Sequence, residues 1–200
     1  MPVFAGGTAA FNNQTKAVEM KMIKRTLAKM RGEQDIDKLV KRGLKVGENC
    51  NLRGSTIDPS HCFHITIGNN VTFGPRVHIL AHDASTKIFL GHTRVANVKI
   101  GSNVFIGAFS VVLPGVTIGD NVVIGAGSIV THDIPSDSVA LGSPARVVKP
   151  LSEFLEERKK EMTGQNVFGK EFTLRNPDFG QDQREQLINA CEQFGQIYVE

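Results

Sequence analysis

The sequence predicts a mainly β protein, built as a parallel β-helix with helical segments at both ends. Three observations predict this fold. An apolar anchor recurs every six residues, glycine directly follows most anchors, and a small or β-branched residue lies four positions after each anchor. An α-helix has no period of six, and an alternating hairpin needs no glycine at each repeat. The anchors are Val46, Leu52, Ile67, Phe73, Ile79, Ile100, Ile106, Val112, Ile118, Ile124 and Val130.

Three such hexapeptides are expected to form one triangular coil, with coils stacked at about the 4.8 Å spacing of neighbouring strands. Each anchor points into the prism, and each glycine is expected to help the chain turn. The glycines lie at positions 47, 68, 74, 101, 107, 119 and 125.

Residues 1–45 are expected to form an N-terminal helical segment. Between residues 15 and 42, apolar residues fall at helical spacing among lysines and arginines, and Gly32 interrupts the run. The stretch DIDKLVKRG predicts another turn or two of helix before Gly43. An amphipathic packing or capping helix is the simplest interpretation.

The repeat of residues 46–150 breaks twice. Leu52 and Ile67 are 15 residues apart, and Ile79 and Ile100 are 21 apart, so each break shifts the phase by three. Continuing the register through the second break would point Asp83 into the prism, where an unpaired carboxylate is costly. We therefore expect the chain to leave the coil in an excursion loop over about residues 82–97.

Residues 151–200 are expected to form a C-terminal helical extension. A short helix is predicted over LSEFLEERKKEM, followed by an irregular stretch. In DQREQLINACEQFGQ, one helical face carries Leu187, Ile188, Cys191 and Phe194, so this face is expected to pack on a neighbour.

Composition narrows the class of protein. Of 200 residues, 40% are hydrophobic and 22% charged, as in a soluble globular domain. A net charge of +3 without a basic stripe among aromatics argues against nucleic acid as a partner. No stretch is apolar enough to span a membrane or act as a signal peptide. Three cysteines without metal or redox spacing predict buried thiols in a reducing compartment, and hence a cytoplasmic location.

The run from Ile100 to Pro150 closely resembles the hexapeptide-repeat acyltransferases, in particular the branch of maltose, galactoside and polysaccharide O-acetyltransferases. The motifs that carry this resemblance are VFIGAFSVVLPGV, IGAGSIV followed by THDIP, and the closing GSPARVV. The resemblance implies a left-handed β-helix and a homotrimer with active sites between subunits. It also implies transfer of an acetyl group from acetyl-CoA, a co-substrate rather than a permanently bound cofactor, to a hydroxyl of a sugar or glycan, as in polysaccharide biosynthesis.

His82 is the predicted general base. Acetyl transfer to a hydroxyl needs a base that takes the hydroxyl proton, and the pKa of histidine suits that task near neutral pH. In the resembling enzymes the catalytic histidine lies on an excursion shortly before the FIGA coil, which is where His82 falls. Asp83 is a second catalytic candidate, as a group that orients the imidazole, although adjacent side chains on an extended segment point apart. Alternatively, the two residues form an ordinary loop turn in which Asp83 caps backbone amides.

The resemblance also assigns binding residues for both substrates. For coenzyme A they are Ala108, Ala126, Thr131, Arg146, Lys149 and Phe105, with Arg146 and Lys149 near the phosphates. For the acceptor they are Asn51, Asp58, His92 and Arg94, from the early coils and the excursion. Asp58 precedes Pro59, so a role in a turn is an alternative.

Two other classes of function remain open. One is a zinc-dependent, carbonic-anhydrase-like hydratase on the same scaffold, because His61, His64, His78 and His82 lie close in sequence. His78 and His82 could pair, but no third ligand is evident, so we expect no metal site. The other class is a non-catalytic hexapeptide-repeat protein.

Overall fold

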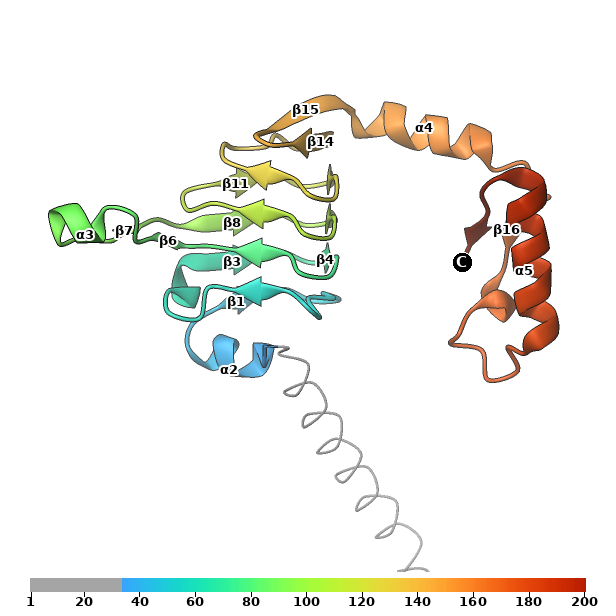
Figure 1. Cartoon of the computed structure of the whole chain (residues 1–200), viewed down its shortest axis with the longest axis horizontal. Coiled ribbons are helices and arrows are strands. Elements are labelled where there is room, and N and C mark those ends of the chain that lie inside the picture. The colour runs from blue at the N-terminus through green and yellow to red at the C-terminus, as the bar shows by residue number, and fades with distance from the viewer. Residues whose placement is uncertain (1–33) are drawn as a thin grey trace, which may run out of the picture. The chain divides into compact units, whose positions relative to one another are not determined.

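The computed structural model describes residues 34–200 and shows a three-sided β prism (Figure 1). Sheet A consists of β1 (Lys45–Val46), β3 (Ile65–Ile67), β8 (Val98–Ile100) and β11 (Thr117–Ile118). Sheet B consists of β4 (Thr72–Phe73), β9 (Val104–Ile106), β12 (Val122–Ile124), β14 (Ser138–Gly142) and β15 (Ala145–Pro150). Sheet C consists of β2 (Thr56–Ile57), β5 (His78–Ile79), β10 (Val111–Val112) and β13 (Ile129–Val130). The prediction of a mainly β fold is confirmed.

Every strand pair within the prism is parallel except β14 and β15, which form an antiparallel closing pair. The chain runs from sheet A to B to C and back to A, so each circuit places a residue over its counterpart one coil earlier. In sheet C, for example, Ile57 pairs with Ile79, Ile79 with Val112, and Val112 with Val130. All four side chains are buried, and the six-residue period predicts this for the three anchors Ile79, Val112 and Val130.

The repeat glycines serve close stacking rather than turning, which corrects their predicted role. A Cβ added to Gly68 would lie 2.7 Å from the carbonyl carbon of Gly101, and one on Gly101 would lie 2.7 Å from that of Gly119. Neither glycine has a positive φ. A side chain at these positions would therefore collide with the backbone of the next coil.

The turn from sheet A to sheet B is made by asparagine. Five stacked residues there have φ near +55°, a conformation that asparagine and aspartate tolerate better than most residues. Their side chains form a ladder of hydrogen bonds, in which each amide donates to the residue one coil further along, at 2.9 to 3.3 Å. The members are Asn49, Asn70, Asn103, Asn121 and Asp137.

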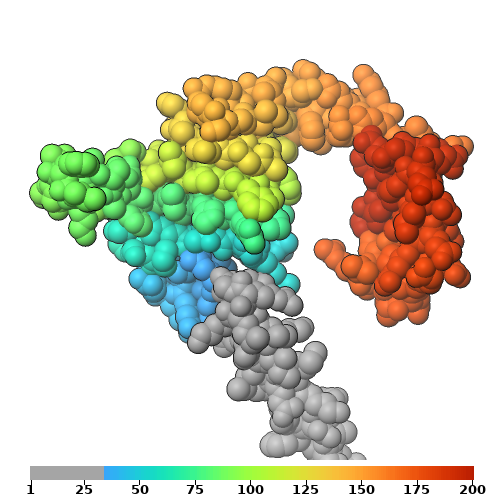
Figure 2. Space-filling model, in the orientation of Figure 1, coloured from blue at the N-terminus to red at the C-terminus, as the bar shows by residue number. Residues whose placement is uncertain are grey.

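Both breaks in the repeat leave the prism at the same corner, between sheets C and A, here called the C–A edge. The first is a short loop, residues 58–64, that contains the 3₁₀ turn η1 (Cys62–His64). The second holds an antiparallel pair, β6 (His82–Asp83) with β7 (Arg94–Val95), and the short helix α3 (Lys87–Leu90). We call residues 82–97 the arm, and Figures 1 and 2 show it standing out from the side of the stack.

The first coil is closed from below by α2 (Ile36–Lys41), whose Leu39 joins the buried core. Asp35 caps this helix, since its carboxylate accepts from the Lys38 amide. Gln34 occupies the exposed edge of β2, because its side-chain amide donates to the Ile57 carbonyl at 2.9 Å and accepts from the Ile57 amide. Helix α2 falls where DIDKLVKRG predicts a turn or two. The rest of the predicted N-terminal helix lies outside the described residues.

The described residues up to Leu151 form one compact unit, and Ser152–Glu200 form a second. The second unit contains α4 (Leu151–Glu161), β16 (Val167–Phe168), η2 (Lys170–Phe172), α5 (Gln181–Phe194) and β17 (Tyr198–Val199). Tyr198 donates to Glu161 at 2.6 Å and ties the end of the chain to α4. No helix within residues 34–200 combines the length and hydropathy that crossing a bilayer requires.

The expectation that all three thiols are buried is wrong. Cys62 is buried and Cys50 half-buried, but Cys191 is exposed on α5. Ile188, on the same predicted face, is 57% exposed, so none of the residues 34–200 covers the part of this face formed by Ile188 and Cys191.

Replacement of Gly101 by alanine should destabilise the prism by about 1–3 kcal/mol, since the added methyl group meets backbone that cannot move aside. The measurement is the midpoint of urea unfolding. A midpoint equal to that of the unaltered protein would contradict the stacking role of Gly101.

Candidate active site

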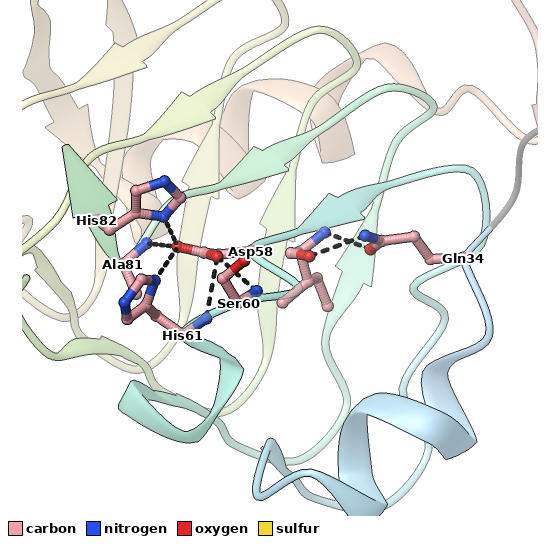
Figure 3. A network of polar contacts seen from close by, with 7 residues as sticks. Gln34, Asp58, Ser60, His61, Ala81 and His82 are labelled. Atoms are coloured by element: carbon pink, nitrogen blue, oxygen red, sulfur yellow. Dashed lines mark hydrogen bonds and ion pairs between the residues drawn. The ribbon is translucent and has the colours of Figure 1, made fainter. Parts of the chain in front are cut away.

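The most distinctive polar contact in the prism joins two residues from different coils. Asp58 Oδ2 accepts a short hydrogen bond from Nδ1 of His82 (Figure 3). Asp58 directly follows β2, whereas His82 begins the arm after β5. The Asp58 side chain is fully buried and that of His82 is one third exposed. A buried carboxylate therefore holds the inner nitrogen of an imidazole whose ring reaches the surface.

The Asp58 carboxylate is satisfied on all sides. Oδ1 accepts from the backbone amides of Ser60, at 3.0 Å, and His61, at 3.1 Å. Oδ2 accepts from the amide of Ala81 at 3.2 Å, in addition to His82. Burial acts to raise the pKa of Asp58, but the hydrogen bonds, led by that from His82, outweigh burial and hold this pKa below its ordinary value of 3.8. Asp58 is therefore an anion that cannot donate a proton to the imidazole.

The two residues meet because both excursions leave at the C–A edge. Ile57 pairs with Ile79 in sheet C, and the Asp58 amide donates to the Ile79 carbonyl at 2.8 Å. Asp58 thus lies one coil before the point where the arm begins. The first excursion turns around the Asp58 carboxylate, and the second passes directly over it.

The contact determines which nitrogen of His82 can act as a base. A carboxylate only accepts hydrogen bonds, so Nδ1 of a neutral His82 must carry the proton. Nε2 then carries the lone pair, and this nitrogen lies on the side of the ring away from Asp58 in Figure 3. An oriented imidazole with an available Nε2 has the arrangement that general-base catalysis requires.

Asp83 does not contact the imidazole. Its carboxylate accepts from the Ser85 amide at 2.9 Å, and this hydrogen bond contributes most to lowering the pKa of Asp83 below its ordinary value. Asp83 thus caps a backbone amide, as in the alternative interpretation, although His82 and Asp83 form strand β6 and not a turn. The predicted orienting role does not fit Asp83, because Asp58 occupies that position.

Asp58 does not fit its predicted contact with an acceptor, because its oxygens are buried and already bonded.

A second imidazole, that of His61, lies beside the Asp58–His82 pair. His61 packs against His82 with the ring centroids 4.7 Å apart, and its Nδ1 is 3.8 Å from Asp58 Oδ2. The sequence suggested a pairing of His78 with His82, but the structure instead brings His61 to His82.

The remaining predicted acceptor residues are spread over the molecule. Arg94, on β7, donates to the Pro114 carbonyl at 2.8 Å and so anchors the arm to the third coil. His92 is exposed at the far side of the arm, with Nδ1 2.6 Å from the Leu90 carbonyl. Asn51 is exposed on the first coil and pairs with Thr72 in sheet B. Of these three, Arg94 alone holds the arm against the prism.

The predicted coenzyme A residues do not gather around His82 within one chain. Ala108 and Ala126 lie one above the other at the corner between sheets B and C, where Gly127 donates to the Ala108 carbonyl at 2.8 Å. Phe105 is 46% exposed on the outer face of β9 in sheet B. Thr131 lies at the C–A edge, as His82 does, but two coils further along, about 10 Å by strand spacing.

An open hollow of about 290 Å³ lies at the end of the same edge. It is lined by residues that follow β13 and by residues of β15: His132, Asp133, Ile134, Ala145, Arg146 and Val147. The Arg146 guanidinium donates to the Ala145 carbonyl at 2.9 Å, and Arg146 is exposed. Lys149 follows on β15 and is half-buried. The C–A edge therefore runs from the His82 imidazole to a hollow that is bordered by the Arg146 guanidinium.

The partnership of Asp58 with His82 was missed by reasoning from the sequence. The signal for it is present, since each residue closely follows a buried isoleucine of a sheet C strand, Ile57 or Ile79, at the start of an insertion. Recognising this requires knowing that both insertions start at the same corner.

Comparisons with known proteins found several similar chains. Residues 97–132 match the family described as bacterial transferase hexapeptide (six repeats). The chain is 41% identical to protein CapG of Staphylococcus aureus over 147 residues, which covers 70% of this chain and 80% of CapG. It is 35% identical to the galactoside O-acetyltransferase of Lactococcus lactis over 147 residues, 60% of this chain and 70% of that enzyme. A solved galactoside acetyltransferase in complex with coenzyme A aligns at 32% identity and a TM-score of 0.47, over 59% of this chain and 70% of that one.

Asp58→Asn should change how stability depends on acidity. Because the folded-state pKa of Asp58 is depressed, its carboxylate stabilises the fold above the ordinary value of 3.8, and this stabilisation is lost as pH falls through the lower folded-state pKa. Urea midpoints from about pH 5 to about pH 3 should therefore fall less steeply in Asp58→Asn than in the unaltered protein. Parallel curves would show that Asp58 contributes nothing to acid unfolding.

Proposed function

The chain belongs to the hexapeptide-repeat acyltransferases, and we propose that it is an acetyl-CoA-dependent O-acetyltransferase that acts on a hydroxyl of a sugar or glycan. The observation that carries this proposal is the contact of Asp58 with Nδ1 of His82, which leaves Nε2 as a base. The names of its relatives support the chemistry, since one that is 35% identical is a galactoside O-acetyltransferase.

His82 acts as the general base in a direct transfer. Nε2 takes the proton of the acceptor hydroxyl while the hydroxyl oxygen attacks the carbonyl carbon of the thioester. The tetrahedral intermediate then collapses, the carbon–sulfur bond breaks, and the imidazolium returns the proton to the departing thiolate. The products are the acetyl ester and coenzyme A, so atoms and charges balance. No acyl-enzyme is proposed, since the Cys62 thiol, which is next to His61 in the sequence, is buried and directed at the carbonyl oxygens of Leu39 and Arg42.

Asp58 is a positioning residue for this step. Its carboxylate fixes the ring orientation and the neutral tautomer, and it stabilises the imidazolium that forms when Nε2 takes the proton. Three backbone amides hold Asp58 in turn, from Ser60, His61 and Ala81, so the base rests on a rigid support.

Coenzyme A is proposed to lie along the prism edge with its phosphates near Arg146 and Lys149. The hollow at Arg146 offers an exposed guanidinium, which suits charge-assisted bonds to phosphate. The thioester would then point back along the edge toward His82. Thr131 lies on this edge, whereas Ala108 and Ala126 lie at another corner, so the two alanines could flank the pantetheine arm only from a neighbouring copy of the chain.

We further propose a homotrimer with the active site between subunits. Two features support assembly. Ala108 and Ala126 lie at a different corner from His82, so one chain cannot easily present both sets to one ligand. In addition, the arm ends in three apolar side chains, Ile88, Phe89 and Leu90, which are 90%, 83% and 68% exposed. Such a patch in a single chain is typical of a contact surface.

By the same family relationship, the coils are proposed to wind left-handed. A cytoplasmic location is supported by the three free thiols, one of them exposed, because reducing compartments preserve such groups.

His82→Ala should reduce acetyl transfer by about 10²–10⁴-fold, the usual contribution of a general base, while leaving the assembly intact. Release of free thiol from acetyl-CoA, measured over a panel of sugars and glycans, reports the activity. Circular dichroism and light scattering report the fold and the oligomer. Unchanged turnover in a folded His82→Ala variant would remove His82 from the mechanism. Absence of turnover in the unaltered protein as well as in the variant would favour a non-catalytic role for the chain.

Arg146→Ala should weaken coenzyme A binding by about tenfold, since one charge-assisted hydrogen bond is lost. Calorimetric titration gives the dissociation constant. Arg53→Ala is the matched control, because this exposed arginine of the first coil removes the same charge far from the hollow. Equal dissociation constants for the two variants would argue against phosphate contact at Arg146.

A further inference from the structure

The ring of His61 has an inner nitrogen without a partner. Nδ1 of His61 is buried and has no hydrogen-bond partner in the described chain. Its nearest anionic atom is Asp58 Oδ2, at 3.8 Å, which is too far for a hydrogen bond. Buried polar atoms are rarely left unpaired, because the desolvation cost is not recovered. The nitrogen faces the Asp58–His82 pair, so a group that fits between the three side chains would satisfy it.

The position of His61 follows from the turn around Asp58. The backbone amide of His61 donates to Asp58 Oδ1 at 3.1 Å, and the imidazole then packs on that of His82. Three potential ligand atoms, one from each side chain, all lie within 4.8 Å of one another. Two imidazole nitrogens and a carboxylate oxygen form a donor set that suits zinc and neighbouring transition metals.

We propose that Asp58, His61 and His82 bind a divalent transition-metal ion such as Zn²⁺, and that the bound ion takes the place of the proton on His82 Nδ1. Ligand atoms around a tetrahedral zinc are about 3.4 Å apart, given zinc–ligand bonds of about 2.1 Å. The separation between His61 and Asp58 is already close to this value. His82 must withdraw slightly from Asp58, and its ring is one third exposed at the start of the arm.

Occupation of this site changes the chemistry of His82. A metal on Nδ1 needs the lone pair of that nitrogen, so the single proton of the neutral imidazole must move from Nδ1 to Nε2 by exchange with solvent. Nε2 then becomes a donor instead of a base. The metal-bound protein therefore cannot accept a proton from a hydroxyl. This consequence rests on the proposed function, whereas binding of the ion does not.

The proposed site differs from a hydratase centre on the same scaffold. In a hydratase the zinc activates water, and removal of the ion abolishes activity. Here the ion competes with the catalytic state of His82, so removal of the ion should restore activity. A chelator would therefore abolish activity in a hydratase, but it should restore activity in this protein.

Binding can be measured without any substrate. Protein freed of metal with a chelator is titrated with Zn²⁺ by calorimetry and with Co²⁺ by visible absorption. Every protein carries Cys191→Ser, because the exposed thiol is itself a soft ligand for zinc. One ion per chain is expected. His61→Gln should bind it about tenfold or more weakly, whereas the matched control His78→Gln, on β5, should bind it as tightly as the parent.

Acetyl transfer is then followed as Zn²⁺ is added. Activity should fall in step with occupancy and return when a chelator is added. Absence of stoichiometric binding, equal affinity of the His61→Gln variant, or turnover unaffected by a bound ion would each overturn the proposal. If the ion binds as expected but no acceptor is acetylated, the metal site stands and the proposed function fails.

Discussion

The stacking of successive coils in strict register governs the rest of this structure. Each strand lies directly over its counterpart one circuit earlier, at the spacing of neighbouring strands in a sheet. At the corners the backbones approach so closely that Gly68 and Gly101 cannot carry a side chain. The same register aligns Asn70 with Asn103, so that a strained corner conformation is stabilised by hydrogen bonds between coils. The local sequence pattern and the packing between coils thus both depend on the same register between successive coils.

The candidate site is a product of this register. Because both insertions leave at the C–A edge, a residue after β2 and a residue after β5 come together. The buried Asp58 carboxylate would be costly alone, yet four donors satisfy it. The interactions that stabilise the turn therefore also hold the His82 ring. Asp58 and the amides that hold it belong to the first excursion, whereas the candidate base, His82 Nε2, belongs to the arm.

The distribution of the other predicted ligands has a geometric origin. A triangular prism presents each corner in a different direction, so residues at the C–A edge and at the corner of Ala108 cannot face one ligand in an isolated chain. The arm ends in three exposed apolar side chains, which a second copy would cover. Assembly around a common axis could place the two kinds of corner from different copies at one ligand and could also cover the apolar side chains of the arm. The trimer is part of the proposed function for these two reasons.

The sequence by itself determined the six-residue repeat, the buried anchors and the two breaks, because these depend on local spacing, and short motifs made His82 the predicted base. It misassigned the repeat glycines, since their close contacts lie 16 or more residues away in the next coil. It also assigned the orienting role to Asp83, the sequence neighbour of His82, and an acceptor contact to Asp58. Only the tertiary structure decided that Asp58, 24 residues earlier, holds the imidazole and that His61 stands beside it. The physical reason is that two insertions of different length start from the same corner of the prism, and a linear period does not encode which corner that is.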